Sequence, residues 1–152
     1  MRPASAATAV GDEVTGREIV VRAEPMKTVA ALLNDPNPIH WDTRVVAALG
    51  LGDAPVNQGP LNMGYLQSML AQWAGGHGRL REFRVRFAGN VFAGQTVRPG
   101  AVVTEIVTDG AQRVADCEIW LDVAGGDRVL HGRALIVLPD PNTDDEERTA
   151  DG

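Results

Sequence analysis

The pattern of hydrophobic and polar positions changes its period along this chain. From about residue 80 onward the period is two, so that Phe83, Val85 and Phe87 alternate with Arg84 and Arg86. This alternation predicts four consecutive strands joined by glycine-containing turns, near residues 80–88, 95–108, 112–124 and 128–138. Strands that follow one another directly favour an antiparallel sheet. One further short strand is expected at residues 17–22.

Before residue 80, apolar residues recur at helical spacing instead. A first helix is predicted to start at Glu24 or Pro25 and to end at Asp35, because Pro36 disfavours helical backbone in the residue before it. Its apolar face comprises Met26, Val29, Ala30 and Leu33. A second, short helix is expected over about residues 43–49, with Asp42 as its N-cap and Gly50 as its left-handed stop.

The third helix is the longest. It has Pro60 in its first turn, ends at Gly75 and Gly76, and carries a stripe of large apolar residues, Leu66, Met69, Leu70 and Trp73. One long apolar helix followed by an antiparallel meander predicts an α+β fold in which the sheet wraps around a central helix. The chain contains no internal repeat, so we expect a single copy of this unit.

Length and charge refine the domain limits. With 152 residues and a hydrophobic fraction of 44%, the chain is one domain with a sizeable core. The net charge of −6 comes mostly from the last fourteen residues, which hold six acidic residues and one arginine. We therefore expect a flexible N-terminus over residues 1–10, a folded domain over 11–138 and a disordered acidic tail over 139–152.

Composition also narrows the class of protein. No apolar run approaches 18 residues and the N-terminus lacks the apolar core of a signal peptide, so no membrane association is expected. A single cysteine, Cys117, fits a reducing compartment, and we expect a cytoplasmic protein. One lysine and no basic, aromatic-interleaved surface argue against nucleic-acid binding. The histidines and the cysteine lack metal-ligand spacing, so neither a metal nor a cofactor is expected.

The candidate chemistry lies in the segment Asn34-Asp35-Pro36-Asn37-Pro38-Ile39-His40-Trp41-Asp42. Its two prolines have a fixed φ and lack amide donors, which predicts a stiff, non-helical loop with Asp35 and His40 at its ends. An acid and a base held on such a loop can both reach one small reactant, as water activation requires. The alternative is a proline-rich turn with a solvated aspartate and a surface histidine.

The downstream sequence favours the first interpretation. The Asp35–Asp42 motif, Gly50-Leu51, the turn Gln58-Gly59-Pro60 and the later stretches Phe83–Phe87 and Phe92–Val97 resemble the MaoC-like family of (R)-specific enoyl-thioester hydratases and 3-hydroxyacyl dehydratases. The resemblance covers about residues 10–138. It implies a hotdog fold, with Asp35 and His40 as the catalytic pair and the backbone N–H of Gly59 as the donor to the enolate oxygen.

The chain departs from the family pattern at Gln58, where the family has histidine. The resemblance makes Asn37, Gln58 and Asn62 candidates for substrate contacts, and Gly59, Leu61 and Asn62 supply backbone N–H groups that Pro60 lacks. Arg84 and Arg86 are candidates for binding the phosphates of the thiol carrier. Strand alternation alone also explains these two arginines as one solvated face.

The implied activity is the reversible hydration of trans-2-enoyl thioesters to (R)-3-hydroxyacyl thioesters, in fatty-acyl, steroid side-chain or polyketide-type metabolism. The carrier would be coenzyme A or acyl carrier protein. A homodimer formed by joining sheets is expected, and a heterodimer is possible. Two alternatives are a subunit of a heteromeric dehydratase and a hotdog thioesterase. The absence of any Asp or Glu from Gly59 to Gly76 argues against the thioesterase.

Overall fold

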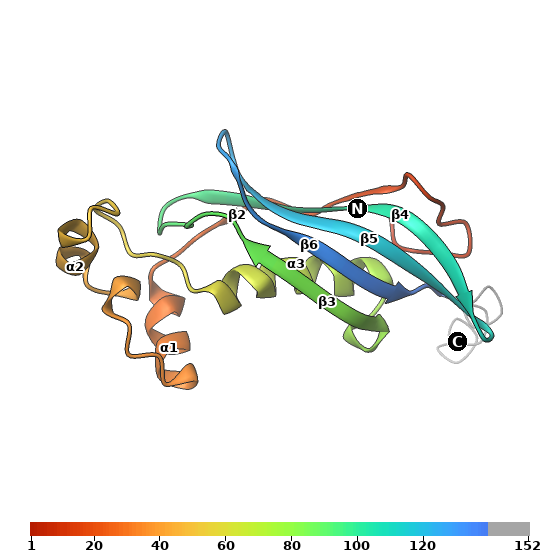
Figure 1. Ribbon diagram of the computed structural model, residues 1–152, viewed down its shortest axis with the longest axis horizontal. Helices are drawn as coiled ribbons and strands as arrows, with labels where there is room; N and C mark the ends of the chain where they lie inside the picture. The colour runs from red at the N-terminus through yellow and green to blue at the C-terminus, as the bar shows by residue number, and fades with distance from the viewer. Residues whose placement is uncertain (140–152) are drawn as a thin grey trace, which may run out of the picture.

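The computed structural model describes residues 1–139 and consists of a six-stranded antiparallel sheet lying along one long helix (Figure 1). The strands are β1 (Glu13–Thr15), β2 (Ile19–Val20), β3 (Leu80–Phe87), β4 (Thr96–Asp109), β5 (Gln112–Val123) and β6 (Arg128–Val137). The helices are α1 (Glu24–Leu33), α2 (Thr43–Ala48) and α3 (Gly59–Ala74), with single 3₁₀ turns η1 (Pro38–His40) and η2 (His77–Arg79).

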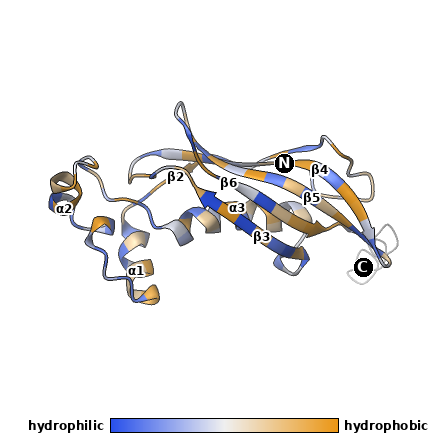
Figure 2. Ribbon diagram, in the orientation of Figure 1, coloured by the Kyte–Doolittle hydropathy of each residue, from blue (hydrophilic) through white to orange (hydrophobic). Residues whose placement is uncertain are grey.

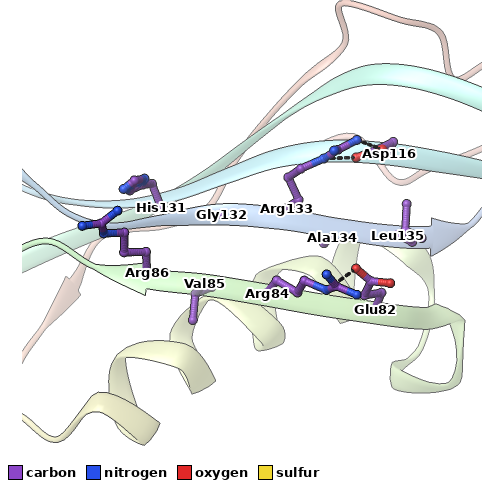
Figure 3. Close-up of a pocket in the computed structure, with 10 residues that line it drawn as sticks. All are labelled: Glu82, Arg84, Val85, Arg86, Asp116, His131, Gly132, Arg133, Ala134 and Leu135. Atoms are coloured by element: carbon purple, nitrogen blue, oxygen red, sulfur yellow. Dashed lines mark hydrogen bonds and ion pairs between the residues drawn. The ribbon is translucent and has the colours of Figure 1, made fainter.

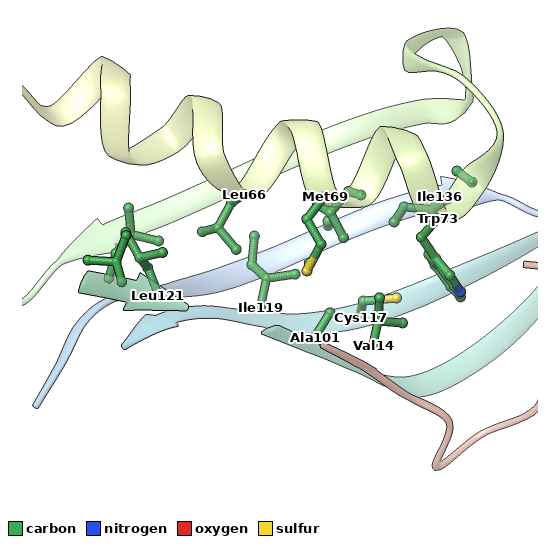
Figure 4. Close-up of a cluster of buried hydrophobic side chains, with 14 of the residues drawn as sticks. Val14, Leu66, Met69, Trp73, Ala101, Cys117, Ile119, Leu121 and Ile136 are labelled. Atoms are coloured by element: carbon green, nitrogen blue, oxygen red, sulfur yellow. The ribbon is translucent and has the colours of Figure 1, made fainter. Parts of the chain in front are cut away.

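The sheet has the order β1-β4-β5-β6-β3, and β2 also pairs with β4. Its inner face packs on α3. Leu66, Met69 and Trp73 point from the helix towards Cys117 and Ile119 of β5, and all five are buried (Figure 4). Burial of each large apolar side chain contributes roughly 1.5–3 kcal/mol, so this contact is what fixes the helix on the sheet.

This arrangement is the expected hotdog fold. The four long strands and the three helices lie where the periodicity predicts them, and hydrophilic and hydrophobic residues alternate along β3 (Figure 2). The sequence pattern missed β1. That strand has only three residues, and its pairing with Gly100–Val102 of β4 defines it. A strand this short carries too few positions to show a period.

Helices α1 and α2 lie beyond the end of the sheet, at the side where α3 begins (Figure 1). On the predicted apolar face of α1, Met26 and Ala30 are buried, whereas Leu33 is 52% exposed. Leu33 lies in the last turn of a helix that projects past the sheet, where no element of residues 1–139 covers it. Asp42 caps α2 as predicted, since its Oδ1 accepts the Arg44 N–H at 2.9 Å.

Part of the N-terminal segment also differs from expectation. Ala4 is buried and its N–H donates to the Trp73 carbonyl at 2.8 Å, while Arg113 donates to the carbonyls of Ala6 and Thr8. These bonds pack residues 4–8 against the domain, in contrast to the flexible segment expected over residues 1–10. Residues 140–152, which include nearly all of the predicted acidic tail, lie outside the described residues. No helix within residues 1–139 is long and apolar enough to cross a membrane.

Candidate active site

Asp35 is positioned by the end of α1. Asn34 adopts a left-handed conformation with a φ of 50°, and it is the one non-glycine residue with positive φ in residues 1–139. This turn lets the Asp35 N–H donate to the Ala30 carbonyl at 2.8 Å. The Asp35 Oδ1 then accepts the Asn37 N–H at 3.0 Å. One carboxylate oxygen is therefore held by the loop, and the other is available to the site.

His40 comes from a turn that the sequence predicted to be non-helical. The structure instead forms a single 3₁₀ turn over Pro38–His40, because proline is tolerated at a first helical position and the Asn37 Oδ1 caps the turn through the Ile39 N–H at 3.3 Å. The turn directs the imidazole inward, where His40 is 8% exposed. Its Nε2 lies 3.3 Å from Oδ2 of Asp35. The loop thus brings the two predicted residues into direct contact.

The second ring nitrogen of His40 defines the tautomer. Nδ1 lies 2.6 Å from the carbonyl oxygen of Val56, which can only accept a hydrogen bond. Nδ1 therefore carries the proton, and in the neutral ring Nε2 presents its lone pair towards Asp35. Two acceptors facing each other in this way suit a shared proton or a water molecule that donates to both.

Val56 also ties this loop to the start of α3. Its N–H donates to the Ile39 carbonyl at 3.0 Å, and the next residue, Asn57, donates through its N–H to the Val91 carbonyl at 2.7 Å. Gly59 follows Val56 by three residues, which limits their separation to about 10 Å. The candidate oxyanion donor therefore lies within about 10 Å of the residue whose carbonyl orients His40. Sequence reasoning could not find the role of Val56, because a backbone carbonyl has no residue signature.

Gly59 retains a free backbone donor at the N-terminus of α3. Of the donors expected there, Leu61 and Asn62 are engaged, because both N–H groups donate to the Gln58 carbonyl, at 3.1 and 3.2 Å. The Gly59 N–H has no partner within residues 1–139. A Cβ at this position would lie 3.0 Å from Cζ of Phe87, so the ring of Phe87 covers this glycine closely.

The other polar candidates near Gly59 form a buried amide group. Gln58 is 1% exposed and its Nε2 donates to the Met26 carbonyl at 2.7 Å, which joins α3 to α1. The Asn57 Nδ2 donates to Oδ1 of Asn62 at 2.8 Å. Oδ1 of Asn57 and Oε1 of Gln58 are buried without a partner in the described part of the chain. Asn37, in contrast, is exposed beside Asp35.

The predicted arginines lie elsewhere. Phe83 and Val85 pack on the core, so Arg84 and Arg86 occupy the outer face of β3. There they line a pocket with Arg133 and His131 of β6, and Arg84 pairs with Glu82 at 2.7 Å (Figure 3). Asp35 lines a different pocket, so the structure does not bring these arginines to Asp35 and His40.

The pocket that Asp35 does line has a volume of about 470 Å³ and lies along α1. Sequence reasoning missed two of its residues, Lys27 and Trp41. A helical signal for this face existed, because Lys27, Ala31 and Asn34 are spaced at i, i+4 and i+7 and lead directly to Asp35. Among residues 1–139, no group of three or more His, Cys, Asp or Glu side chains could hold a metal ion.

A protein-family model and several solved structures match this chain. The family model described as "MaoC like domain" matches residues 5–118. No curated protein matches. The fold is similar to an (R)-hydratase from A. caviae involved in PHA biosynthesis, with a TM-score of 0.76 and 24% identity over 89% of this chain and 100% of that one.

Two further solved structures share the fold. R-hydratase PhaJ1 from Pseudomonas aeruginosa has a TM-score of 0.78 and 20% identity, over 91% of this chain and 87% of that one. A chain of the ChsH1-ChsH2 complex from Mycobacterium tuberculosis has a TM-score of 0.71 and 18% identity, over 87% of this chain and 99% of that one. At these identities the likeness establishes a common fold.

Proposed function

The chain belongs to the MaoC-like domain family, and we propose that it catalyses the reversible hydration of trans-2-enoyl thioesters to (R)-3-hydroxyacyl thioesters. Asp35 and His40 are the acid–base pair in this proposal, and the backbone N–H of Gly59 binds the thioester oxygen. The acyl group is carried by coenzyme A or acyl carrier protein.

One observation carries the proposal. His40 contacts Asp35 through Nε2 at 3.3 Å while its Nδ1 is bound to the Val56 carbonyl at 2.6 Å. A histidine whose second nitrogen is held by a backbone carbonyl has a defined orientation and tautomer, which general acid–base catalysis needs. A surface histidine in a proline-rich turn would not require burial or this second bond.

The geometry supports a simple sequence of proton transfers. A water molecule donates one hydrogen to Nε2 of His40 and the other to Oδ2 of Asp35, which turns its oxygen lone pair towards Cβ of the substrate. As the O–Cβ bond forms, Nε2 takes a proton from the water and the π electrons of the Cα=Cβ bond move towards the thioester oxygen. The acid–base pair then returns one proton to Cα, so that the net change is the addition of one water molecule.

The negative charge on the thioester oxygen is stabilised at the N-terminus of α3. The free Gly59 N–H lies where the helix dipole favours negative charge. Glycine has no side chain there, so the thioester would bind in the space beside the Phe87 ring, where a Cβ would intrude. α3 itself contributes no carboxylate, since Gly59–Ala74 holds no Asp or Glu.

We also propose that the active species is a homodimer joined through β3. This strand has eight residues and lies at one edge of the sheet, and Phe87 at its end is 47% exposed. A long unpaired edge is normally covered by pairing with another strand. The mass in solution tests this proposal. Twice the chain mass of 16.2 kDa is expected, and an active monomer would contradict it.

The activity is tested by loss of the enoyl absorbance of crotonyl-CoA, with chiral analysis of the product. Asp35→Asn and His40→Gln should each lower turnover by roughly 10²-fold or more, the usual contribution of a general acid or base. Matched controls are Asp53→Asn and His77→Gln, because both residues are exposed and have no side-chain partner within residues 1–139. Near-normal hydration by either pair variant, or an (S)-product, would refute the assignment.

A further inference from the structure

We propose that the pocket beside Asp35 selects acyl groups that end in a carboxylate, and that Lys27 binds this carboxylate. The inference rests on the proposed hydration of enoyl thioesters and specifies their substrate class. It also adds Lys27 and Trp41 to the site as specificity-determining residues.

The pocket has the shape of a slot for a chain. One wall is a face of α1 with Ala30 and Ala31 at its centre, where short side chains leave the space open. Trp41, which is 37% exposed, forms part of the lining and offers an indole surface to methylene groups. Lys27 lies in the first turn of α1, and Asp35 lies in the loop just beyond the helix's C-terminal end.

Lys27 supplies the single positive charge of this lining, and Asp35 supplies the single negative charge. Within residues 1–139, six arginines form ion pairs with carboxylates of the chain, namely Arg44, Arg81, Arg84, Arg98, Arg128 and Arg133. Lys27 forms no ion pair within residues 1–139. An exposed ammonium group that lines a pocket and lacks an internal partner is suited to an anionic ligand.

The spacing of the two charges favours the acyl chain as the source of that anion. Lys27 lies six residues before Leu33, the last residue of α1, which is about 9 Å along the helix, and Asp35 follows in the loop directly after it. Water held by Asp35 and His40 adds to Cβ, so the remainder of the acyl group starts beside Asp35. A carboxylate a few bonds beyond Cβ can reach towards Lys27. The phosphate of a pantetheine carrier is separated from the thioester by the whole pantetheine arm.

The experiment compares two coenzyme A thioesters of equal carbon number, trans-2-hexenoyl-CoA and trans-2-hexenedioyl-CoA, which differ in the terminal carboxylate. The measured quantity is the ratio of kcat/KM for the dioyl to that for the monoacyl thioester. Lys27→Met should lower this ratio about fivefold, the upper range for an ion pair that water still reaches. Lys27→Arg should retain most of the preference. Added salt should lower the ratio in the parent protein but not in Lys27→Met.

The matched control is Arg22→Met, which removes the same charge from an exposed residue that does not line the pocket. An equal fall in the ratio for Arg22→Met would overturn the inference, because the ratio would then depend on the overall positive charge of the protein and not on contact with Lys27. A ratio that changes less than about twofold in Lys27→Met would also overturn it. If Lys27→Met lowers kcat/KM equally for both thioesters and weakens inhibition by free coenzyme A, Lys27 binds the carrier phosphate instead. That result would also overturn the inference.

Failure of the inference is separable from failure of the proposed function. If the parent protein hydrates hexenoyl-CoA but not hexenedioyl-CoA, the carboxylate preference is wrong while the hydratase assignment stands. If it hydrates neither thioester, nor the same two acyl groups carried by acyl carrier protein, the hydratase assignment itself is refuted.

Discussion

Replacement of Gly59 by alanine distinguishes a catalytic glycine from a packing glycine. The added Cβ would lie 3.0, 3.3 and 3.6 Å from Cζ, Cε1 and Cε2 of Phe87. Ordinary carbon contacts are about 3.5–4.0 Å, so the tip of the ring must move by roughly half an ångström. Phe87 is 47% exposed in the single chain, so no backbone of residues 1–139 has to move with the ring. The cost of such a shift, about 0.5–1.5 kcal/mol, corresponds to at most about tenfold in rate.

A methyl group that blocks the approach of the thioester to the Gly59 N–H should cost considerably more. Loss of one oxyanion donor reduces turnover by about 10²–10³-fold. We therefore expect Gly59→Ala to lower kcat/KM for crotonyl-CoA by about 10²-fold. The same loss should persist in a Phe87→Leu background, where the clashing ring is gone.

Gly64→Ala is the matched control, since Gly64 lies in the same helix and an added Cβ meets nothing within 4 Å. Alanine is favoured over glycine inside a helix by about 1 kcal/mol, so this variant should be slightly more stable and fully active. The catalytic role of Gly59 is refuted if Gly59→Ala loses less than about tenfold, or if Phe87→Leu restores its activity.

Three further predictions concern stability and reactivity. Gln58→Ala should lower the urea midpoint by the equivalent of about 1–3 kcal/mol, because it removes a fully buried side chain and its hydrogen bond to the Met26 carbonyl. The exposed Gln72→Ala should leave the midpoint unchanged, and equal midpoints for the two variants would contradict this. Hydrogen bonds from the Arg44 side chain and backbone lower the pKa of Asp42 from 3.8 to about 2. The stabilisation of α2 by the Asp42 carboxylate should therefore be complete above pH 3.8 and disappear as the pH falls through 2. An NMR titration of that carboxyl measures this. Burial, with a smaller effect of Asp116, raises the pKa of the Cys117 thiol from 9.0 to about 12. The thiol of the folded protein should therefore resist alkylation at pH 8, and the folded state should lose stability as the pH rises from 9.0 to 12. Rapid labelling of the folded protein would refute this.

Most of the fold follows from local patterns. The strands β3 to β6 are long enough for the alternation to be visible, and the helices carry their own limits in Asp42, Gly50 and Gly75. The features that the sequence did not predict depend on distant partners. β1 exists because it pairs with β4, and Leu33 is exposed because α1 extends past the sheet.

The same distinction applies within the candidate site. Asp35 and His40 are five residues apart on proline-restrained backbone, so their proximity was predictable from local geometry. The Val56 carbonyl that orients His40 is sixteen residues away, and Phe87 reaches Gly59 from the end of β3. Neither contact can be predicted from the residues that surround it in the sequence. The first contact depends on how the η1 turn packs against the start of α3, and the second on how the end of β3 packs there.

The geometry of the candidate site therefore depends on the hydrogen bonds at one place, the start of α3. Gln58, at the start of α3, is hydrogen-bonded to the Met26 carbonyl of α1. Two residues earlier, Val56 is hydrogen-bonded to Ile39 and His40 of η1. The proposed acid–base pair, the free Gly59 N–H and the Lys27 pocket are thus held by hydrogen bonds between the segment that contains α1 and η1 and a four-residue stretch, Val56–Gly59. A substitution that loosens this stretch should misplace all three together. A substitution at Asp35, Gly59 or Lys27 should instead change one function and leave the other two measurable.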